Sequence, residues 1–181
     1  NDIHVVYFDN DTKSAKYGYA QNGDGSTAEK AWINLDGGSD NDDTNFGAGL
    51  VTAGATRSTS AGEYLAVDVD EAGNPVVMYY DTTNATLKLA RATNSTPTTP
   101  AEWVRQTVFR TDDPNRFFVG KHIAMKIDNA GNIHAVAAKT SVGDLVYLYA
   151  PNVDGTATDY VFDYSTVVDT EGAVGTWADV T

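Results

Sequence analysis

The sequence contains no cysteine in its 181 residues, so disulfide bonds are excluded. It also has no apolar run near the ~18 residues that a membrane-spanning helix needs, and we expect no membrane insertion. Basic residues are scarce, with 12 Lys and Arg against 25 Asp and Glu, which gives a net charge of −13 and an isoelectric point near 4.3. This charge disfavours binding to nucleic acid and favours cations, basic partners or simple solubility.

Several functional motifs are absent as well. There is no glycine-rich phosphate loop, no recognisable order of Ser, His and Asp, and no basic aromatic surface. The sequence begins with Asn1 instead of Met and shows no signal peptide, as expected of a processed mature form or an excised piece. Its abundance of Ser, Thr, Asn, Asp and Gly resembles secreted and cell-surface β proteins, so we expect that location.

What the sequence does contain is a four-strand unit between Gly62 and Val108. Two alternating runs flank the turn Asp70–Asn74, in which Gly73 takes a positive φ at low cost. The predicted strands of this unit are Tyr64–Val69, Pro75–Tyr80, Thr86–Ala92 and Trp103–Val108. Their order along the chain predicts an antiparallel meander.

The four-strand unit recurs along the chain. A shift of 58 residues places Leu65–Asn74 on Ile123–Asn132, and a shift of 72 residues places Val77–Asp81 on Val5–Asp9. A repeat of this size built from four strands is the signature of propeller blades. The other predicted strands are Asp2–Phe8, Ala15–Ala20, Trp32–Leu35, Ile123–Asp128, Ile133–Ala138, Asp144–Ala150, Tyr160–Val168 and Gly175–Thr181.

The repeats predict one all-β domain over residues 1–181, a β-propeller of four-stranded antiparallel blades. We expect residues 1–36 and 174–181 to form a permuted blade, 62–109 a second blade and 120–168 a third, with 37–61 as a long acidic loop. Three blades are too few to close a ring, since propellers typically use ~4 to 8. We therefore expect the ring to be completed by a second copy, by another chain or by missing sequence.

Two features favour contacts beyond this chain. Both faces of the first predicted strand are apolar, with Val5 and Tyr7 on one side and Val6 and Phe8 on the other. Strands of this kind are typical of a sheet that is packed between two neighbouring sheets. Trp177 lies on the predicted terminal strand, whose partner surface is missing from the chain, so it is the candidate for an inter-chain contact.

The Asp-x-x-Gly-Asn turns at 70–74 and 128–132, the Tyr79-Tyr-Asp strand ending and the aromatic residue that opens each fourth strand resemble bacterial β-propellers of the sialidase-like, or BNR-repeat, type. The resemblance implies that links from the second to the third strand, and from the fourth strand to the next blade, lie on the face where propellers bind ligands. On that face it collects Asp9, Asp11, Asp40, Asp42, Asp43, Asp81, Asp112 and Asp113.

Within the long loop, the run from Ser39 to Asn45 has oxygen-bearing side chains at alternating positions, including Asp40, Asp42 and Asp43. Calcium takes about 6 to 8 oxygen ligands of this kind. The run has neither the turn glycine nor the downstream Glu of an EF-hand. It is interpreted either as a calcium site or as a solvated acidic loop.

The remaining acidic residues of this face, Asp9, Asp11, Asp81, Asp112 and Asp113, are candidate ligand-binding residues. Asp9 and Asp81 occupy equivalent repeat positions, with Lys139 at the third, so a carboxylate pair for glycoside hydrolysis is one interpretation. The other is a shared turn without catalysis, since Asp at a strand end caps turns. No residue is assigned as catalytic.

Histidine and tryptophan also recur at repeat positions. His4 and His134 coincide with Val76, so we interpret both histidines as core-lining residues rather than ligands. Trp32 and Trp103 both open a fourth strand, so we interpret them as equivalent blade-packing residues, with sugar stacking as the alternative.

Three functions follow from these patterns. The leading hypothesis is a secreted or cell-surface binding module that presents an acidic, calcium-loaded or metal-free face to a carbohydrate or protein partner. The alternatives are a propeller-type glycoside hydrolase and a structural subunit of a larger surface assembly, in which the chain forms a homo-oligomer or completes its ring with another chain.

Overall fold

The computed structural model describes residues 2–20, 32–37, 60–108, 119–139, 143–151, 162–169 and 178–181. Within these residues the chain is all β, apart from one 3-10 turn, η3 (Pro100–Glu102). The strands are β1 (Ile3–Asp9), β2 (Ser14–Ala20), β3 (Trp32–Gly37), β4 (Ala61–Val69), β5 (Pro75–Asp81), β6 (Thr86–Ala92), β7 (Trp103–Thr107), β8 (Val119–Ile127), β9 (Ile133–Lys139), β10 (Asp144–Ala150) and β11 (Asp163–Asp169).

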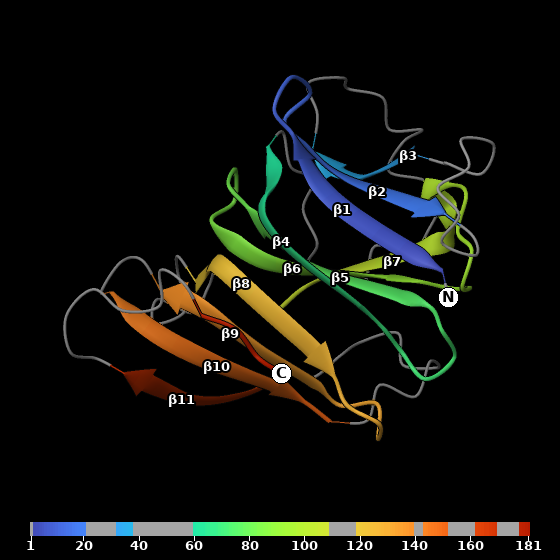
Figure 1. Cartoon of the computed structure of the whole chain (residues 1–181). Helices are drawn as coiled ribbons and strands as arrows, with labels where there is room; N and C mark the ends of the chain where they lie inside the picture. The colour runs from blue at the N-terminus through green and yellow to red at the C-terminus, as the bar shows by residue number, and fades with distance from the viewer. Residues whose placement is uncertain are drawn as a thin grey trace.

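The strands form three antiparallel sheets, which confirms the predicted meanders. The first sheet has the order β1-β2-β3, the second β4-β5-β6-β7 and the third β8-β9-β10-β11. Figure 1 shows the three sheets following one another across the molecule, from the blue first sheet through the green second sheet to the orange third sheet. Strand β4 contacts both β1 and β8. Over the described residues the sheets do not close into a ring.

The recurring five-residue turn has the same geometry in the second and third sheets. Asp70 accepts hydrogen bonds from the backbone N–H groups of Ala72 and Asn74, at 3.0 and 2.8 Å. Asp128 accepts the equivalent bonds in the third sheet, both at 2.9 Å. The glycine of each turn has a φ near 80°, where any side chain would be strained. These side-chain caps explain why the turn motif recurs with its Asp and Gly fixed.

The first strands of the second and third sheets begin earlier than the sequence indicated. β4 starts at Ala61 and β8 at Val119, because each strand crosses a register irregularity near its start. Gly62 and Gly120 lie at these irregularities, with φ angles of 100° and 127°. A Cβ on Gly62 would lie 2.6 Å from the Cβ of Ala15 in the first sheet. Glycine therefore lets β4 approach the neighbouring sheet closely.

The predicted terminal strand over 175–181 is not seen where it can be checked. Residues 178–181 form no strand, and Trp177 lies outside the described residues. In the described part of the chain the first sheet consequently has three strands, with β1 at its edge. Val5 of β1 pairs with Gly18, as Val77 of β5 pairs with Ala90 in the second sheet. β1 thus corresponds to the second strand of the four-strand unit, as the repeats predicted.

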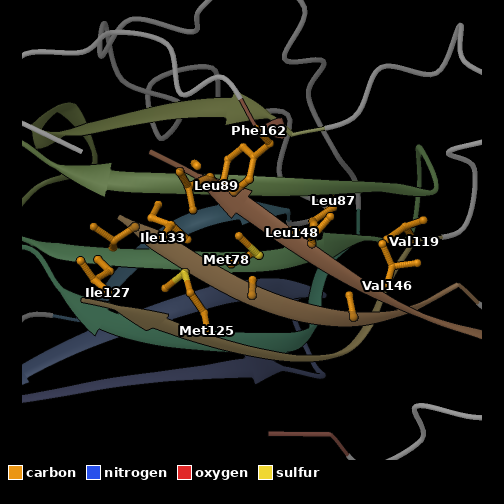
Figure 2. Close-up of a cluster of buried hydrophobic side chains, with 14 residues drawn as sticks. Met78, Leu87, Leu89, Val119, Met125, Ile127, Ile133, Val146, Leu148 and Phe162 are labelled. Carbon is orange, nitrogen blue, oxygen red and sulfur yellow. The ribbon is translucent and has the colours of Figure 1, made fainter. Parts of the chain in front are cut away.

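Two layers of side chains join the sheets. The layer between the second and third sheets is apolar, and Figure 2 shows Met78 and Leu89 meeting Ile133 and Leu148 there. The layer between the first and second sheets combines aromatic and aliphatic side chains, with Tyr17 of β2 packed edge-on against Trp103 of β7, their ring centroids 4.8 Å apart. Strands β5 and β6 are buried along their whole length, as expected of the central sheet.

Candidate functional site

Two of the turns that the resemblance assigns to one face, β1–β2 and β5–β6, lie at the same end of the first two sheets. The backbone of Ala61 donates a hydrogen bond to the carbonyl of Lys13 in the β1–β2 turn. The backbone of Thr82, in the β5–β6 turn, donates to the carbonyl of Ser60. Gly37 pairs with Ser14 beside the β1–β2 turn, and Ser60 contacts the β5–β6 turn. The segment 38–59 therefore starts and ends at this end of the sheets. We call this end of the sheets the loop end.

Asp9 caps the β1–β2 turn at the loop end. Its Oδ1 accepts hydrogen bonds from the backbone N–H groups of Thr12 and Asp11, at 3.1 and 3.0 Å. These bonds, above all those from Thr12, lower the pKa of Asp9. Asp11 is exposed. The geometry is an Asx turn at a strand end, which agrees with the interpretation of Asp9 as a turn residue. The ligand-binding role of Asp9 and Asp11 stays a prediction.

Asp81 occupies the repeat position of Asp9 but is enclosed. Its side chain is fully buried, with Oδ2 2.8 Å from Lys88 Nζ and 2.8 Å from Asn84 Nδ2. Lys88 also lies 2.8 Å from Asp36 Oδ2 of the first sheet, and Tyr79 donates its hydroxyl proton to the same oxygen at 3.0 Å. The carboxylate of Asp81 is therefore engaged within the layer between the first two sheets.

Arg105 completes this buried polar set. Its guanidinium donates hydrogen bonds to the carbonyl oxygens of Leu35, Trp103 and Pro100. Burial lowers the pKa of Arg105, and burial together with the nearby Asp36 carboxylate raises the pKa of Tyr79 well above its ordinary value. We call Asp36, Tyr79, Asp81, Lys88 and Arg105 the polar cluster. It holds two acidic and two basic side chains, so its formal charges balance.

Sequence reasoning missed the polar cluster. Lys88 and Arg91 interrupt the otherwise apolar run of β6, and both are buried, with Arg91 paired to Asp70 of the recurring turn. A basic residue between apolar neighbours in a strand that is buried on both faces needs a buried acid. That rule could have identified Lys88. It could not have named Asp36, because the acid comes from a different sheet.

His4 and His134, which the sequence predicts to line the core, are only partly buried, and each is hydrogen-bonded to a tyrosine. His4 Nδ1 lies 2.7 Å from Tyr17 Oη, and His134 Nδ1 lies 2.6 Å from Tyr147 Oη. Burial lowers the pKa of His4. His134 Nε2 also lies 3.1 Å from Asp128, so the third sheet ties its histidine to the recurring turn.

The predicted equivalence of the two tryptophans is wrong. Trp103 pairs with Ala92, whereas Trp32 pairs with Gly18, the counterpart of Ala90. Trp32 is therefore displaced by two residues along the ladder. Trp103 is fully buried between the sheets, but 54% of Trp32 is exposed. Packing between sheets thus holds for Trp103 and fails for Trp32.

Trp32 belongs to an exposed apolar face on the first sheet. Its ring covers Gly18, where a Cβ would lie 2.2 Å from the indole, and it packs edge-on against Tyr7. Ile3, Val5 and Tyr7 alternate along β1 on the same face and are each between 38% and 44% exposed. In the single chain this side of β1 is exposed, so no described residue supplies the neighbouring sheet that the sequence predicts on it. We call Ile3, Val5, Tyr7 and Trp32 the outer face of the first sheet.

Six predicted site residues lie outside the described residues: Asp40, Asp42, Asp43, Asp112, Asp113 and Trp177. In the described part of the chain no three His, Asp or Glu side chains gather so as to hold a metal ion. Nor does that part contain a helix long and apolar enough to cross a membrane. No family model matches the sequence, and no curated protein matches it.

Proposed function

We propose that the chain forms part of a β-propeller whose loop end is a binding surface for a carbohydrate or protein partner. The sheets supply a rigid frame. The acidic segment 38–59 and the turns beside it supply the contacts. We propose further that Asp40, Asp42 and Asp43 hold calcium within that surface.

The observation that carries this proposal is the convergence of the links at the loop end. The β1–β2 and β5–β6 turns lie there, and the segment that contains Asp40, Asp42 and Asp43 starts after Gly37 and returns at Ser60 beside those turns. Binding residues are often carried on loops that a rigid scaffold positions. The glycoside hydrolase alternative has no comparable support, because Asp81 is enclosed by Lys88 and Asn84.

The test compares the wild-type chain with Asp40→Asn/Asp42→Asn/Asp43→Asn, which removes three negative charges but keeps the side-chain size. Calcium titration by calorimetry and a glycan array are the two measurements. We expect the triple variant to lose the calcium heat and the glycan signals. Glu71→Gln, at an exposed turn of the opposite end, is the matched control and should keep both. Signals that persist in the triple variant would contradict the proposal.

A further inference from the structure

The polar cluster shows how one sheet of this chain recognises the next. On β5 and β6 of the second sheet, Tyr79, Asp81 and Lys88 share the face that points at the first sheet, because Tyr79 and Lys88 are ladder partners. Asp36 of the first sheet completes the set with one carboxylate oxygen that accepts from both Tyr79 and Lys88. A single acid from the preceding sheet thus satisfies two donors of the following sheet.

The first sheet carries a second copy of this receiving surface. Tyr7, Asp9 and Lys16 occupy the repeat positions of Tyr79, Asp81 and Lys88, and Tyr7 and Lys16 are again ladder partners. This copy lies on the outer face, not between sheets. Lys16 is 4.0 Å from Asp9 and its side chain is 20% exposed, against 1% for Lys88. In the described residues, no acidic side chain of a preceding sheet contacts Lys16 in the way that Asp36 contacts Lys88.

The third sheet carries the matching acid position. Asp36 pairs across the ladder with Ala15, and a register irregularity follows between Ala15 and Lys16. Asp169 of β11 pairs with Leu145, the repeat counterpart of Ala15, and the same irregularity follows between Leu145 and Val146. In the second sheet the counterpart of Ala15 is Leu87, and the backbone of Val108 donates a hydrogen bond to it. Val108 thus occupies the position of Asp36, and the second sheet has no acid there. Asp169 therefore stands at the ladder position of Asp36.

The side of the third sheet that faces away from the second sheet repeats the rest of the docking face as well. His134 and Tyr147 stand at the positions of His4 and Tyr17, with the same histidine to tyrosine hydrogen bond. In the first sheet Tyr17 is fully buried against the second sheet, whereas Tyr147 is only partly buried. The third sheet thus presents the surface that the first sheet uses to pack against its neighbour.

We propose that a second copy of this chain binds head to tail, with the outer face of its first sheet packed on the third sheet of the first copy. Asp169 then meets Tyr7 and Lys16 as Asp36 meets Tyr79 and Lys88. Ile3, Val5 and Trp32 supply the apolar part of the contact, and Trp is among the residue types that dominate such interfaces. Two copies joined in this way bring six sheets together, within the usual propeller range of about 4 to 8.

The contact surfaces differ between the two partners, so the arrangement is heterologous. Such contacts close into a ring when the rotation allows and otherwise continue as a filament. The polar part of this contact adjoins the loop end, because Lys16 lies 4.0 Å from Asp9 of the β1–β2 turn. This contact and ligand binding at the loop end are therefore distinguished by their tests. Their tests use different residues and different measurements.

Cysteine crosslinking tests the contact directly, because the chain has no cysteine of its own. One preparation carries Lys16→Cys and a second carries Asp169→Cys, and a short bismaleimide is added to each alone and to their mixture. A head-to-tail contact predicts covalent dimers of one Lys16→Cys and one Asp169→Cys chain in the mixture only. Efficient crosslinking of Lys16→Cys with itself would overturn the proposal, because it would show that first sheets pair with each other.

Charge reversal supplies the second test, read by native mass spectrometry and by light scattering over a range of concentrations. Lys16→Glu and Asp169→Lys should each weaken the association by about tenfold or more, and the double variant should restore it. Trp32→Ala should weaken it by about 30-fold. Val69→Ala, at an exposed position of β4, is the control and should leave it unchanged. A wild-type chain that stays monomeric at all concentrations would overturn the proposal and assign both faces to another occupant.

Discussion

The layer between the first and second sheets contains buried charges, whereas the layer between the second and third sheets is apolar. The same repeat positions differ in chemistry. Lys88 is replaced by Val146 in the third sheet, and Tyr79 is replaced by Ala137. The acid position of Asp36 is held by Val108 in the second sheet. At these repeat positions, polar residues therefore occur on both sides of one layer and on neither side of the other. The charged pair between the second and third sheets, Asp68 and Lys126, lies at the partly exposed contact of β4 with β8.

At these repeat positions, each of the two layers between sheets holds a complete polar set or none. A buried Lys without an acid, or an acid without its donors, would leave a charge unpaired away from water. A fully paired set contributes little net stability, because desolvation offsets most of the attraction between its charges. We infer that the polar cluster specifies which sheet packs against which, while the apolar layer supplies more of the stability.

Removing Lys88, the cation between Asp36 and Asp81, should cause the largest loss in the free energy of unfolding. Lys88→Ala leaves Asp36 and Asp81 buried beside each other without their shared cation, and we expect a loss of about 3 to 5 kcal/mol in the free energy of unfolding. Urea denaturation followed by circular dichroism measures it. Lys88→Met combined with Asp36→Val and Tyr79→Phe removes the charge with its partners, and this variant should lose less than the single substitution. A single variant that loses under about 1 kcal/mol would contradict the buried assignment.

Truncating the apolar layer should have a comparable but somewhat smaller effect. Leu148 is fully buried among the side chains that Figure 2 shows, and Leu148→Ala removes its contacts and leaves a cavity. We expect a loss of about 3 kcal/mol, within the range of about 2 to 5 for buried leucines. Val168→Ala, at a 57% exposed position of the same sheet, is the control and should stay within about 0.5 kcal/mol. Equal losses for both variants would mean that the layer is not packed as described.

Much of the fold could be predicted because its signals are local. Alternating apolar residues gave the strand positions, and β6 and β10 have the predicted boundaries. The Asp and Gly of the recurring turn act within five residues, so their role is visible in sequence. The β1–β2 turn was predicted for the same reason, since Asp9 bonds residues that follow it directly.

The candidate site could be predicted only in part because its decisive contacts link distant strands. Asp36 and Lys88 are far apart in sequence, and their pairing depends on how two sheets stack. Trp32 lies two ladder positions from the place of Trp103, and a register irregularity in the β2–β3 ladder accounts for one of the two. Neither packing between sheets nor such an irregularity leaves a local pattern.

Lowering the pH should change the stability of the polar layer by the smallest amount, because it acts through η3, a turn that contacts the polar cluster. Pro100 of η3 accepts a hydrogen bond from Arg105 of the polar cluster. Glu102 caps this turn by accepting bonds from the backbone N–H groups of Thr98 and Thr99, both at 2.8 Å. These bonds, the one from Thr98 first, lower the pKa of Glu102 to about 2.

A carboxylate whose pKa is lower in the folded state stabilises the fold above its unfolded pKa, near 4.5, and this contribution is lost as the pH falls toward 2. Glu102→Gln keeps an acceptor but removes the charge, so we expect a loss of about 0.5 to 1 kcal/mol at pH 7. The difference from wild type should shrink between pH 4.5 and 2 in urea titrations made at each pH. Glu71→Gln, on an exposed turn, controls for the lost negative charge. A difference that is constant over this range would show that the carboxylate of Glu102 does not cap the turn beside the polar cluster.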